Sequence, residues 1–491
     1  MKLNHLSIMT TLALLAGGCA NIPSVGPDYH KPATKAPAHW IEPLAGGETN
    51  SAISTVAWWK KFHDAELDSL ITRAVCSNLD LRIAQTRVRE VRAEYNGASA
   101  AQWPTLDGGG SYNRWHQSQD QPVLGEFAVP TSAFDGNLYQ AGFDAAWEID
   151  VFGGKRRTVE SAKAQLSAVE FGQRDVLVTL FSEVARNYVD LRGYQKRLAI
   201  ANENIDVQEK TLAITQKRFT NGLAPDLDVE EANTVLATTR AEMPTLESAV
   251  QMATHRLEVL LGEQSGTLQS ELAEAAPIPA QPPQVPVGLP SELLLRRPDV
   301  SRAERQLAAA TANIGVAKAD LFPKFYLTGS VGSESISASD WFTGGSRYWS
   351  VGPTVQWRIF DAGRIRADIR LQNARQEEAL ADYEQTMLTA FEEVEDNLVL
   401  YAKEQERRHS LEDAVVASQK TLDTADKLYA SGLTDYIHVL DAERSLYQAQ
   451  DTLVQSDRTV STDLIALYKS LGGGWETVAR PVALASAQKT K

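Results

Sequence analysis

The sequence predicts a chain of mixed α and β structure in which strands alternate with very long helices, arranged as a tandem duplication. Three observations predict this class: an internal repeat, segments with period-two alternation, and two stretches of more than 60 residues without proline. Each copy is expected to contain a helix, two strands, a very long helix, a glycine-marked turn and a second helix. The first copy covers residues 62–262 and the second covers residues 293–470.

The repeat is carried by motifs that recur in the same order along the chain. At a spacing of 219 and then 210 residues, the matched pairs are Trp103-Pro104 with Phe322-Pro323, Trp147-x-Ile149 with Trp357-x-Ile359, and Phe219-x-x-Gly222-Leu223 with Tyr429-x-x-Gly432-Leu433. The change in spacing places nine extra residues between Pro104 and Trp147, and an insertion of that kind belongs in a surface loop. The chain is therefore a duplication and not two unrelated domains.

The N-terminus has the pattern of a secretory signal, with Lys2, an apolar stretch over residues 6–16 and small residues before Cys19. Such a cysteine suits the lipoprotein signal peptidase, so residues 1–18 are expected to be removed and Cys19 to carry a covalent lipid. The alternative is ordinary cleavage with an unmodified cysteine. The acyl chains of such a lipid would anchor the protein, because each CH₂ buried in the membrane contributes about 0.8 kcal/mol to the free energy of membrane binding. The residue after the cysteine is Ala20 and not Asp. By resemblance to other bacterial lipoproteins, this favours sorting to the outer membrane.

Composition excludes several classes of function. The net charge of −15 and the pI near 5.1 argue against nucleic-acid binding. With Cys19 lipidated, Cys76 has no disulfide partner, and we expect it to be a small packing residue. No two of the eight histidines are four residues apart, and no phosphate loop or nucleophile elbow appears, so we expect no metal site, no cofactor and no enzyme.

The first helix of each copy is expected at residues 79–102 and 300–321, where proline ends it. The clearest strands, at residues 139–151 and 349–359, alternate apolar and polar side chains. This pattern is typical of a strand between lipid and water, and also of a half-buried strand in a soluble sandwich. A length of about 12 residues favours the first, because a tilted transmembrane strand needs roughly 9–11.

Shorter partner strands are expected at residues 105–113 and 324–332. Past the signal, no apolar run is long enough for a transmembrane helix, so a membrane crossing would have to use these strands. Four strands cannot close a barrel, and an open sheet edge is not tolerated in lipid. Several chains must then share one barrel: two would supply eight strands and three would supply twelve. The residues alone leave both open.

The long helices are expected at residues 158–219 and 364–429. At about 1.5 Å per residue, each approaches 100 Å in length. The 4,3,4,3 spacing of their apolar residues is typical of a coiled-coil seam. A structural stalk is the simpler interpretation of such helices taken alone, but a stalk does not explain the strands at one end and the helical turn at the other.

A further set of motifs completes the pattern over nearly the whole mature chain. In order they are Gly26-Pro27-Asp28-Tyr29, Trp58-Trp59-x-x-Phe62-x-Asp64-x-x-Leu67, Asn78-Leu79-Asp80, Arg296-Arg297-Pro298-Asp299-Val300-x-x-Ala303-Glu304, Phe322-Pro323, Trp357-x-Ile359-Phe360-Asp361-x-Gly363, Leu440-Asp441-Ala442-x-Arg444-Ser445-Leu446 and Leu471-Gly472-Gly473-Gly474-Trp475. This ordered set resembles the TolC-like outer-membrane factor family, in the lipoprotein branch (OprM- and NodT-like) that serves resistance–nodulation–division efflux pumps.

The resemblance implies a homotrimer with a 12-stranded β-barrel in outer-membrane lipid, continued into the periplasm as a 12-helix tunnel. It implies an exit duct for drugs or other small molecules that docks to a periplasmic adaptor and an inner-membrane pump. Residues 19–61, 263–292 and 471–491 would form an equatorial belt around the tunnel. Two rival functions are a constitutive diffusion pore, which does not need such long helices, and a structural lipoprotein, which leaves the strand alternation unexplained.

The periplasmic mouth would lie at the two helical tips, residues 219–232 and 429–442, where Gly222 and Gly432 mark the turns. The resemblance places the constriction on Ile437 and Asp441, with Arg444 as an ionic latch. Threefold symmetry would bring three Asp441 carboxylates near one axis; the alternative is a surface i,i+3 pair of small energetic effect. In the first copy the secondary candidates are Leu227, Glu231, Asp226 and Asp228.

Overall fold

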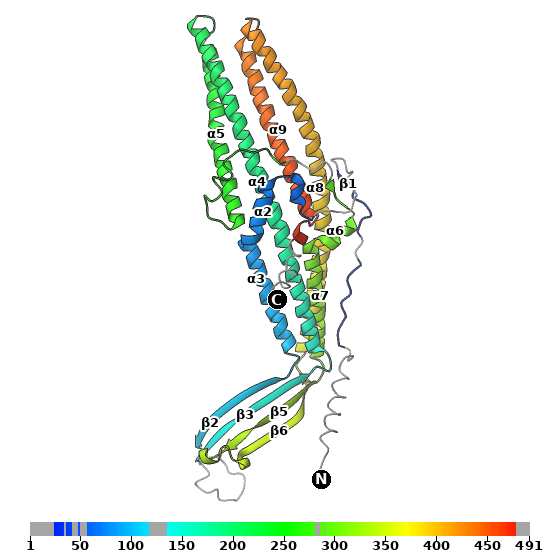
Figure 1. Ribbon diagram of the computed structural model, residues 1–491. Coiled ribbons are helices and arrows are strands. Elements are labelled where there is room, and N and C mark those ends of the chain that lie inside the picture. The colour runs from blue at the N-terminus through cyan, green and yellow to red at the C-terminus, as the bar shows by residue number, and fades with distance from the viewer. Residues whose placement is uncertain are drawn as a thin grey trace, which may run out of the picture. The chain divides into compact units, whose positions relative to one another are not determined.

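The computed structural model of the chain is mixed α and β, mostly helical, with one four-stranded sheet (Figure 1). It describes residues 24–33, 36–41, 48–49, 56–116, 135–279, 285–288 and 290–477. The expected signal peptide, Cys19 and the tail beyond residue 477 lie outside the described residues. Among the residues that are described, no helix is both long enough and apolar enough to cross a membrane.

The two copies share one order of main elements, which is two helices, two strands, a very long helix and a further long helix, whereas their short 3₁₀ helices differ. The first has η2 (Trp58–Phe62), α2 (Ala65–Ser77), α3 (Leu79–Ala100), β2 (Thr105–His116), β3 (Asp135–Ile149), α4 (Gly154–Thr220) and α5 (Asp226–Leu261). The second has α6 (Pro290–Arg296), α7 (Pro298–Ala319), β5 (Lys324–Ser335), η4 (Ala338–Asp340), η5 (Gly344–Ser346), β6 (Arg347–Gln356), α8 (Arg364–Ala430), α9 (Tyr436–Ser470) and η6 (Trp475–Thr477). A short parallel pair, β1 (Glu48–Thr49) and β4 (Val285–Pro286), joins segments outside the two copies. The mixed class and the long helices are therefore confirmed.

The described residues divide into two compact units, and each takes segments from both copies. The strand unit is built mainly from Arg89–Ala168 and Glu304–Asp382. The helical unit is built from Ala33–Val88, from Val169–Ala303 and from the residues that begin at Tyr383. Compact units therefore do not follow the boundaries of the sequence repeat, because the two copies pack side by side within each unit.

The sheet of the strand unit is antiparallel throughout, in the order β2-β3-β5-β6 (Figure 1). Its register places Asp107 opposite Asp144 and Gly108 opposite Phe143. One face therefore carries polar side chains and the other carries exposed apolar ones, such as Phe143 and Trp349. This is the predicted alternation, and among the described residues of the strand unit no second layer covers the apolar face.

The fourth strand is shorter than the sequence predicts. We expected it to continue to residue 359, but β6 ends at Gln356, which pairs with Lys324 at the start of β5. Pro323 precedes Lys324 and has no N–H to donate, so the ladder stops there. The indole N–H of Trp357 instead donates to the carbonyl of Leu321 at 3.1 Å, just as Trp147 donates to Gln102 at 2.9 Å in the first copy.

An aspartate side chain caps the N-terminus of each of the helices α4 and α8. The Asp150 carboxylate accepts hydrogen bonds from the Lys155 and Arg156 amides, at 3.1 and 2.8 Å, at the start of α4. The Asp361 carboxylate does the same for the Gly363 and Ile365 amides, at 3.0 and 2.8 Å, at the start of α8. Each carboxylate satisfies two of the amides that a helix N-terminus leaves unpaired.

The Trp58-Trp59 motif packs in the core of the helical unit. Trp58, which is 1% exposed, stacks on Tyr468 with ring centroids 5.2 Å apart, and Trp59 packs 4.6 Å from Phe181. Such aromatic pairs contribute roughly 0.5–1.5 kcal/mol each beyond the area they bury. The Trp58-Trp59 motif therefore joins η2 to α4 and α9.

A buried guanidinium explains the Arg296-Arg297-Pro298-Asp299 motif. Arg297 forms ion pairs with Asp299 and Glu393, each at 2.6 Å, and donates to the carbonyl of Ser470 at 3.1 Å. These contacts connect the start of α7 to α8 and to the end of α9. The motif is thus a packing centre of the helical unit.

Candidate functional site

The candidate site lies at the two helical hairpin tips, which have the same turn in both copies. Gly222 and Gly432 adopt φ values of 71° and 73°. The next amide reaches back to close each helix, from Leu223 to the Arg218 carbonyl at 2.8 Å and from Leu433 to the Leu428 carbonyl at 2.9 Å. Positive φ is the reason for glycine here, as the sequence predicts.

An apolar cluster holds the two tips of one chain together. Its buried members come from α5, α8 and α9 and are Ala232, Val235, Leu422, Ala425, Tyr436, Val439, Leu440, Ala442 and Leu446. We call this set the tip cluster. Leu212 of α4 packs against it, so all four long helices contribute. One face of α9 is therefore anchored inside the chain.

The predicted gate residues lie on the opposite face of α9. Ile437 is 42% exposed, and Asp441 and Arg444 are exposed one and two turns further along the same face. The structure thus places all three where another molecule can reach them. Asp441 also lines a groove of about 730 Å³ between α8 and α9, together with Lys420 and His438.

The alternative interpretation, a surface pair of Asp441 with Arg444, would need an ion pair within the chain, and none is formed. Among the described residues, Asp441 has no ion pair and Arg444 has none either, although they are three positions apart on one helix. A latch formed by these two charges would therefore have to join one chain to another. The simple surface-pair interpretation finds no support in this geometry.

The secondary candidates in the first hairpin separate into two groups. Asp226 and Leu227 are exposed, and Leu227 is 63% exposed. Asp228 and Glu231 are half-buried. Burial raises the pKa of the Asp228 carboxyl, the negative charge of Asp435 raises it further, and the charge of Arg218 opposes the rise.

Sequence reasoning missed the residue that links the two tips. The Arg218 guanidinium of α4 lies 4.2 Å from the centroid of the Tyr429 ring of α8 and donates to the Tyr429 carbonyl at 3.3 Å. Tyr429 in turn lies 5.3 Å from the ring of Tyr436. The only available signal was the position of Arg218 beside Phe219, the repeat partner of Tyr429.

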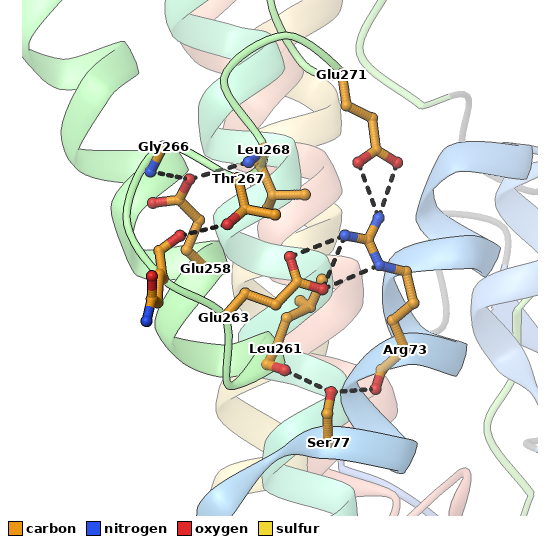
Figure 2. Close-up of polar contacts among 10 residues, drawn as sticks. Arg73, Ser77, Glu258, Leu261, Glu263, Gly266, Thr267, Leu268 and Glu271 are labelled. Atoms are coloured by element: carbon orange, nitrogen blue, oxygen red, sulfur yellow. Dashed lines mark hydrogen bonds and ion pairs between the residues drawn. The ribbon is translucent and has the colours of Figure 1, made fainter.

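The segment that follows α5 is fixed to α2 by charge (Figure 2). Arg73 forms ion pairs with Glu263 and Glu271, at 2.9 and 2.8 Å. Glu258, fully buried, accepts hydrogen bonds from the amides of Gly266 and Leu268 at 2.7 and 3.0 Å. These contacts hold the first part of the predicted equatorial connector in a defined position.

Cys76 does not have the packing role that we expected. It is a free, exposed cysteine near the end of α2. The buried face of that helix consists of Leu67, Leu70, Ile71 and Ala74. Residue 76 falls two positions after Ala74 and so lies on the other side of the helix. Within the described ranges, no three His, Cys, Asp or Glu residues are placed to hold a metal ion.

Known proteins match this chain over both copies of the repeat. The outer membrane efflux protein family matches residues 70–263 and 289–473. The chain is 35% identical to the pyoverdine export outer membrane protein OpmQ of Pseudomonas aeruginosa over 478 residues, covering 97% of this chain and 98% of OpmQ. It is 33% identical to the cation efflux system protein CusC of Escherichia coli O6:H1 over 474 residues, covering 95% and 98% of the two chains.

Solved structures agree in fold. The outer-membrane channel OprN superposes with a TM-score of 0.86 at 36% identity, covering 92% of this chain and 99% of OprN. A CusC structure gives a TM-score of 0.79 at 31% identity, covering 92% and 100%. The match extends over both copies, both hairpins and the sheet. The chain therefore belongs to the outer membrane efflux protein family.

Proposed function

We propose that this chain is the outer-membrane exit duct of a tripartite efflux pump and carries small molecules from the periplasm to the exterior. The observation that supports this most strongly is the combination in one chain of a sheet with an uncovered apolar face and a duplicated pair of long helical hairpins. Relatives named for cation efflux, pyoverdine export and toluene efflux belong to the same family. The role assigned is transport and not catalysis.

The working form in this proposal is a homotrimer. In the sheet as described, β2 and β6 are the outer strands, and each presents one edge to a neighbour. Three copies would join these edges into one closed sheet of twelve strands, leaving no open edge in lipid. The expected lipid on Cys19 would add an anchor to the same membrane.

The hairpin tips would form the periplasmic mouth and dock to an adaptor protein, which connects the duct to an inner-membrane pump of the resistance–nodulation–division type. In the trimer, three copies of Ile437 would narrow the mouth, and three Asp441 carboxylates would form an anionic ring. Arg444 would pair with a carboxylate of a neighbouring copy. The exposure of all three residues and their lack of described partners within the chain support this arrangement.

The double variant Asp441→Ala with Arg444→Ala tests the gate. Removing both charges abolishes any latch between copies, so we expect single-channel conductance in planar bilayers to rise severalfold. A matched control is Lys403→Ala with Glu406→Ala, which removes one cation and one anion three residues apart on an exposed face of α8. Unchanged conductance in the Asp441 and Arg444 variant, or an equal rise in the control, would contradict the gate assignment.

A further inference from the structure

Glu443 is a carboxylic acid inside the otherwise apolar tip cluster. Its side chain is only 5% exposed, between the exposed gate residues Asp441 and Arg444 in sequence but on the opposite face of α9. This burial is achieved within a single chain, by residues of α4 and the tip cluster. Such burial is costly for a charged carboxylate without a partner.

The hydrogen bonds around Glu443 favour a neutral acid. Thr211 Oγ1 of α4 lies 2.9 Å from Glu443 Oε1 and 3.1 Å from the carbonyl oxygen of Val207. A hydroxyl has one proton, so Thr211 can donate to only one of these oxygens. Both contacts are satisfied together when the Glu443 acid donates to Thr211 and Thr211 donates to Val207.

The second carboxyl oxygen supports the same protonation state. Glu443 Oε2 is buried and has no hydrogen-bond partner among the described residues. An unpartnered carbonyl oxygen of a neutral acid is tolerated in a protein interior far better than an unpartnered carboxylate oxygen. No Lys, Arg or His of the described chain lies within ion-pair distance of Glu443.

Among the described residues, the groups that act on Glu443 are neutral or negative. On α5 the neighbouring cluster residues Ala232 and Val235 are apolar, and on α4 Thr211 is neutral. On α8 the charge that acts on Glu443 is that of Asp426, and on α9 the titratable neighbours are Tyr436 and, one turn away, Tyr447. Burial raises the pKa of Glu443, the contact with Thr211 opposes the rise, and the charge of Asp426 adds to it.

We propose that Glu443 is a proton-dependent positioning residue, which holds α9 against α4 as a neutral acid and loosens the tip cluster when it ionises. The link to gating rests on the proposed function, because α9 carries the gate residues on its other face. Packing then requires a bound proton. The packing of α9 against α4 is strongest below the ordinary glutamate pKa of 4.5. It is lost as pH rises through the raised pKa that Glu443 has in the packed state.

Amide hydrogen exchange of the detergent-solubilised full-length protein tests the packing directly. Because packing takes up one proton, protection of α9 amides near the tip is expected to fall by up to about tenfold per pH unit in this window. A scan from about pH 5 to about pH 9 covers it, since buried glutamates titrate as high as about 8–9. Rates are corrected for intrinsic exchange. Constant protection in the unmodified protein would overturn the proposal.

Two variants and one control separate protonation from general destabilisation. Glu443→Gln cannot ionise, so its protection should be independent of pH, whereas Glu230→Gln, an exposed change on α5, should behave like the unmodified protein. Thr211→Val keeps the carboxyl and removes only the hydroxyl that contacts it, so the pH dependence should persist. Equal pH dependence in Glu443→Gln, or its loss in Thr211→Val, would contradict the proposal.

Conductance measured over the same pH range distinguishes this inference from the proposed gate. If both are right, conductance rises with pH in the unmodified channel and stays constant in Glu443→Gln. If protection depends on pH in the expected way while conductance does not, the gate assignment on α9 fails and the role of Glu443 in packing stands.

Discussion

At the scale of single residues, burial raises the pKa of carboxyl groups in the helical unit, and their partners decide whether the net shift is up or down. Burial alone would raise the pKa of Asp299, but the hydrogen bonds and charge of Arg297 outweigh it and bring the pKa below the ordinary value. Asp463 on α9 has no such partner. Burial and the negative charge of Glu404 raise the pKa of Asp463 to about 6, and Arg186 offsets only part of the rise.

We therefore predict that Asp463→Asn stabilises the protein at about pH 7.5, by about 1–3 kcal/mol, and not at about pH 4. The raised pKa means that the stability contributed by the acid form is present below the ordinary value of 3.8 and is lost by about pH 6. The measurement is the shift in thermal unfolding midpoint between variant and unmodified protein at each pH. The exposed Asp413→Asn on α8 is the control; an equal gain at both pH values would contradict the prediction.

At the scale of elements, backbone conformation decides where each hairpin turns. Gly222 and Gly432 have open space where a Cβ would lie, so their need for glycine comes from positive φ alone. Gly97, inside α3, also has open space but no positive φ. The same substitution should therefore have opposite effects at these positions.

Gly432→Ala is expected to destabilise the α8–α9 turn by about 1–2 kcal/mol, because a Cβ disfavours left-handed backbone. Gly432→Asn should cost less, since asparagine tolerates this region. Gly97→Ala should stabilise α3 by roughly 0.5–1 kcal/mol. Thermal unfolding and the rate of proteolysis at the tip measure these effects. A Gly432→Ala protein as resistant as the unmodified one would show that the turn can adopt another conformation.

At the scale of the whole molecule, a single chain leaves large apolar side chains uncovered. Leu106, Phe143 and Trp349 are exposed on one face of the sheet. Outer strands β2 and β6 add two sheet edges. An isolated chain with these features would aggregate in water, so lipid and neighbouring copies are the expected environment.

The detergent-extracted particle is accordingly predicted to contain three chains, giving a protein mass three times that of the mature chain. Multi-angle light scattering with correction for bound detergent measures it, and chemical crosslinking should give a ladder that ends at three. A particle of two chains would favour an eight-stranded sheet, and a stable single chain would contradict the shared sheet altogether.

The duplication, the long helices and most strand segments could be predicted because they depend on local spacing. The pairs Trp147–Trp357 and Gly222–Gly432 recur at one spacing, and the structure places them in equivalent positions. The end of β6 and the exposure of Cys76 could not be predicted. Each depends on a neighbour that is remote in sequence or on which helix face finds a packing partner.

The sequence by itself determined the class of fold, the family and the face of α9 that carries Ile437, Asp441 and Arg444, because periodicity and motif order are properties of the chain alone. Only the tertiary structure decided that Asp441 is exposed while Glu443, two residues later, is enclosed by three other helices. The physical reason is that the free-energy cost of burying a carboxylate depends on its surroundings, and part of those surroundings, on α4 and α5, comes from segments more than 200 residues away.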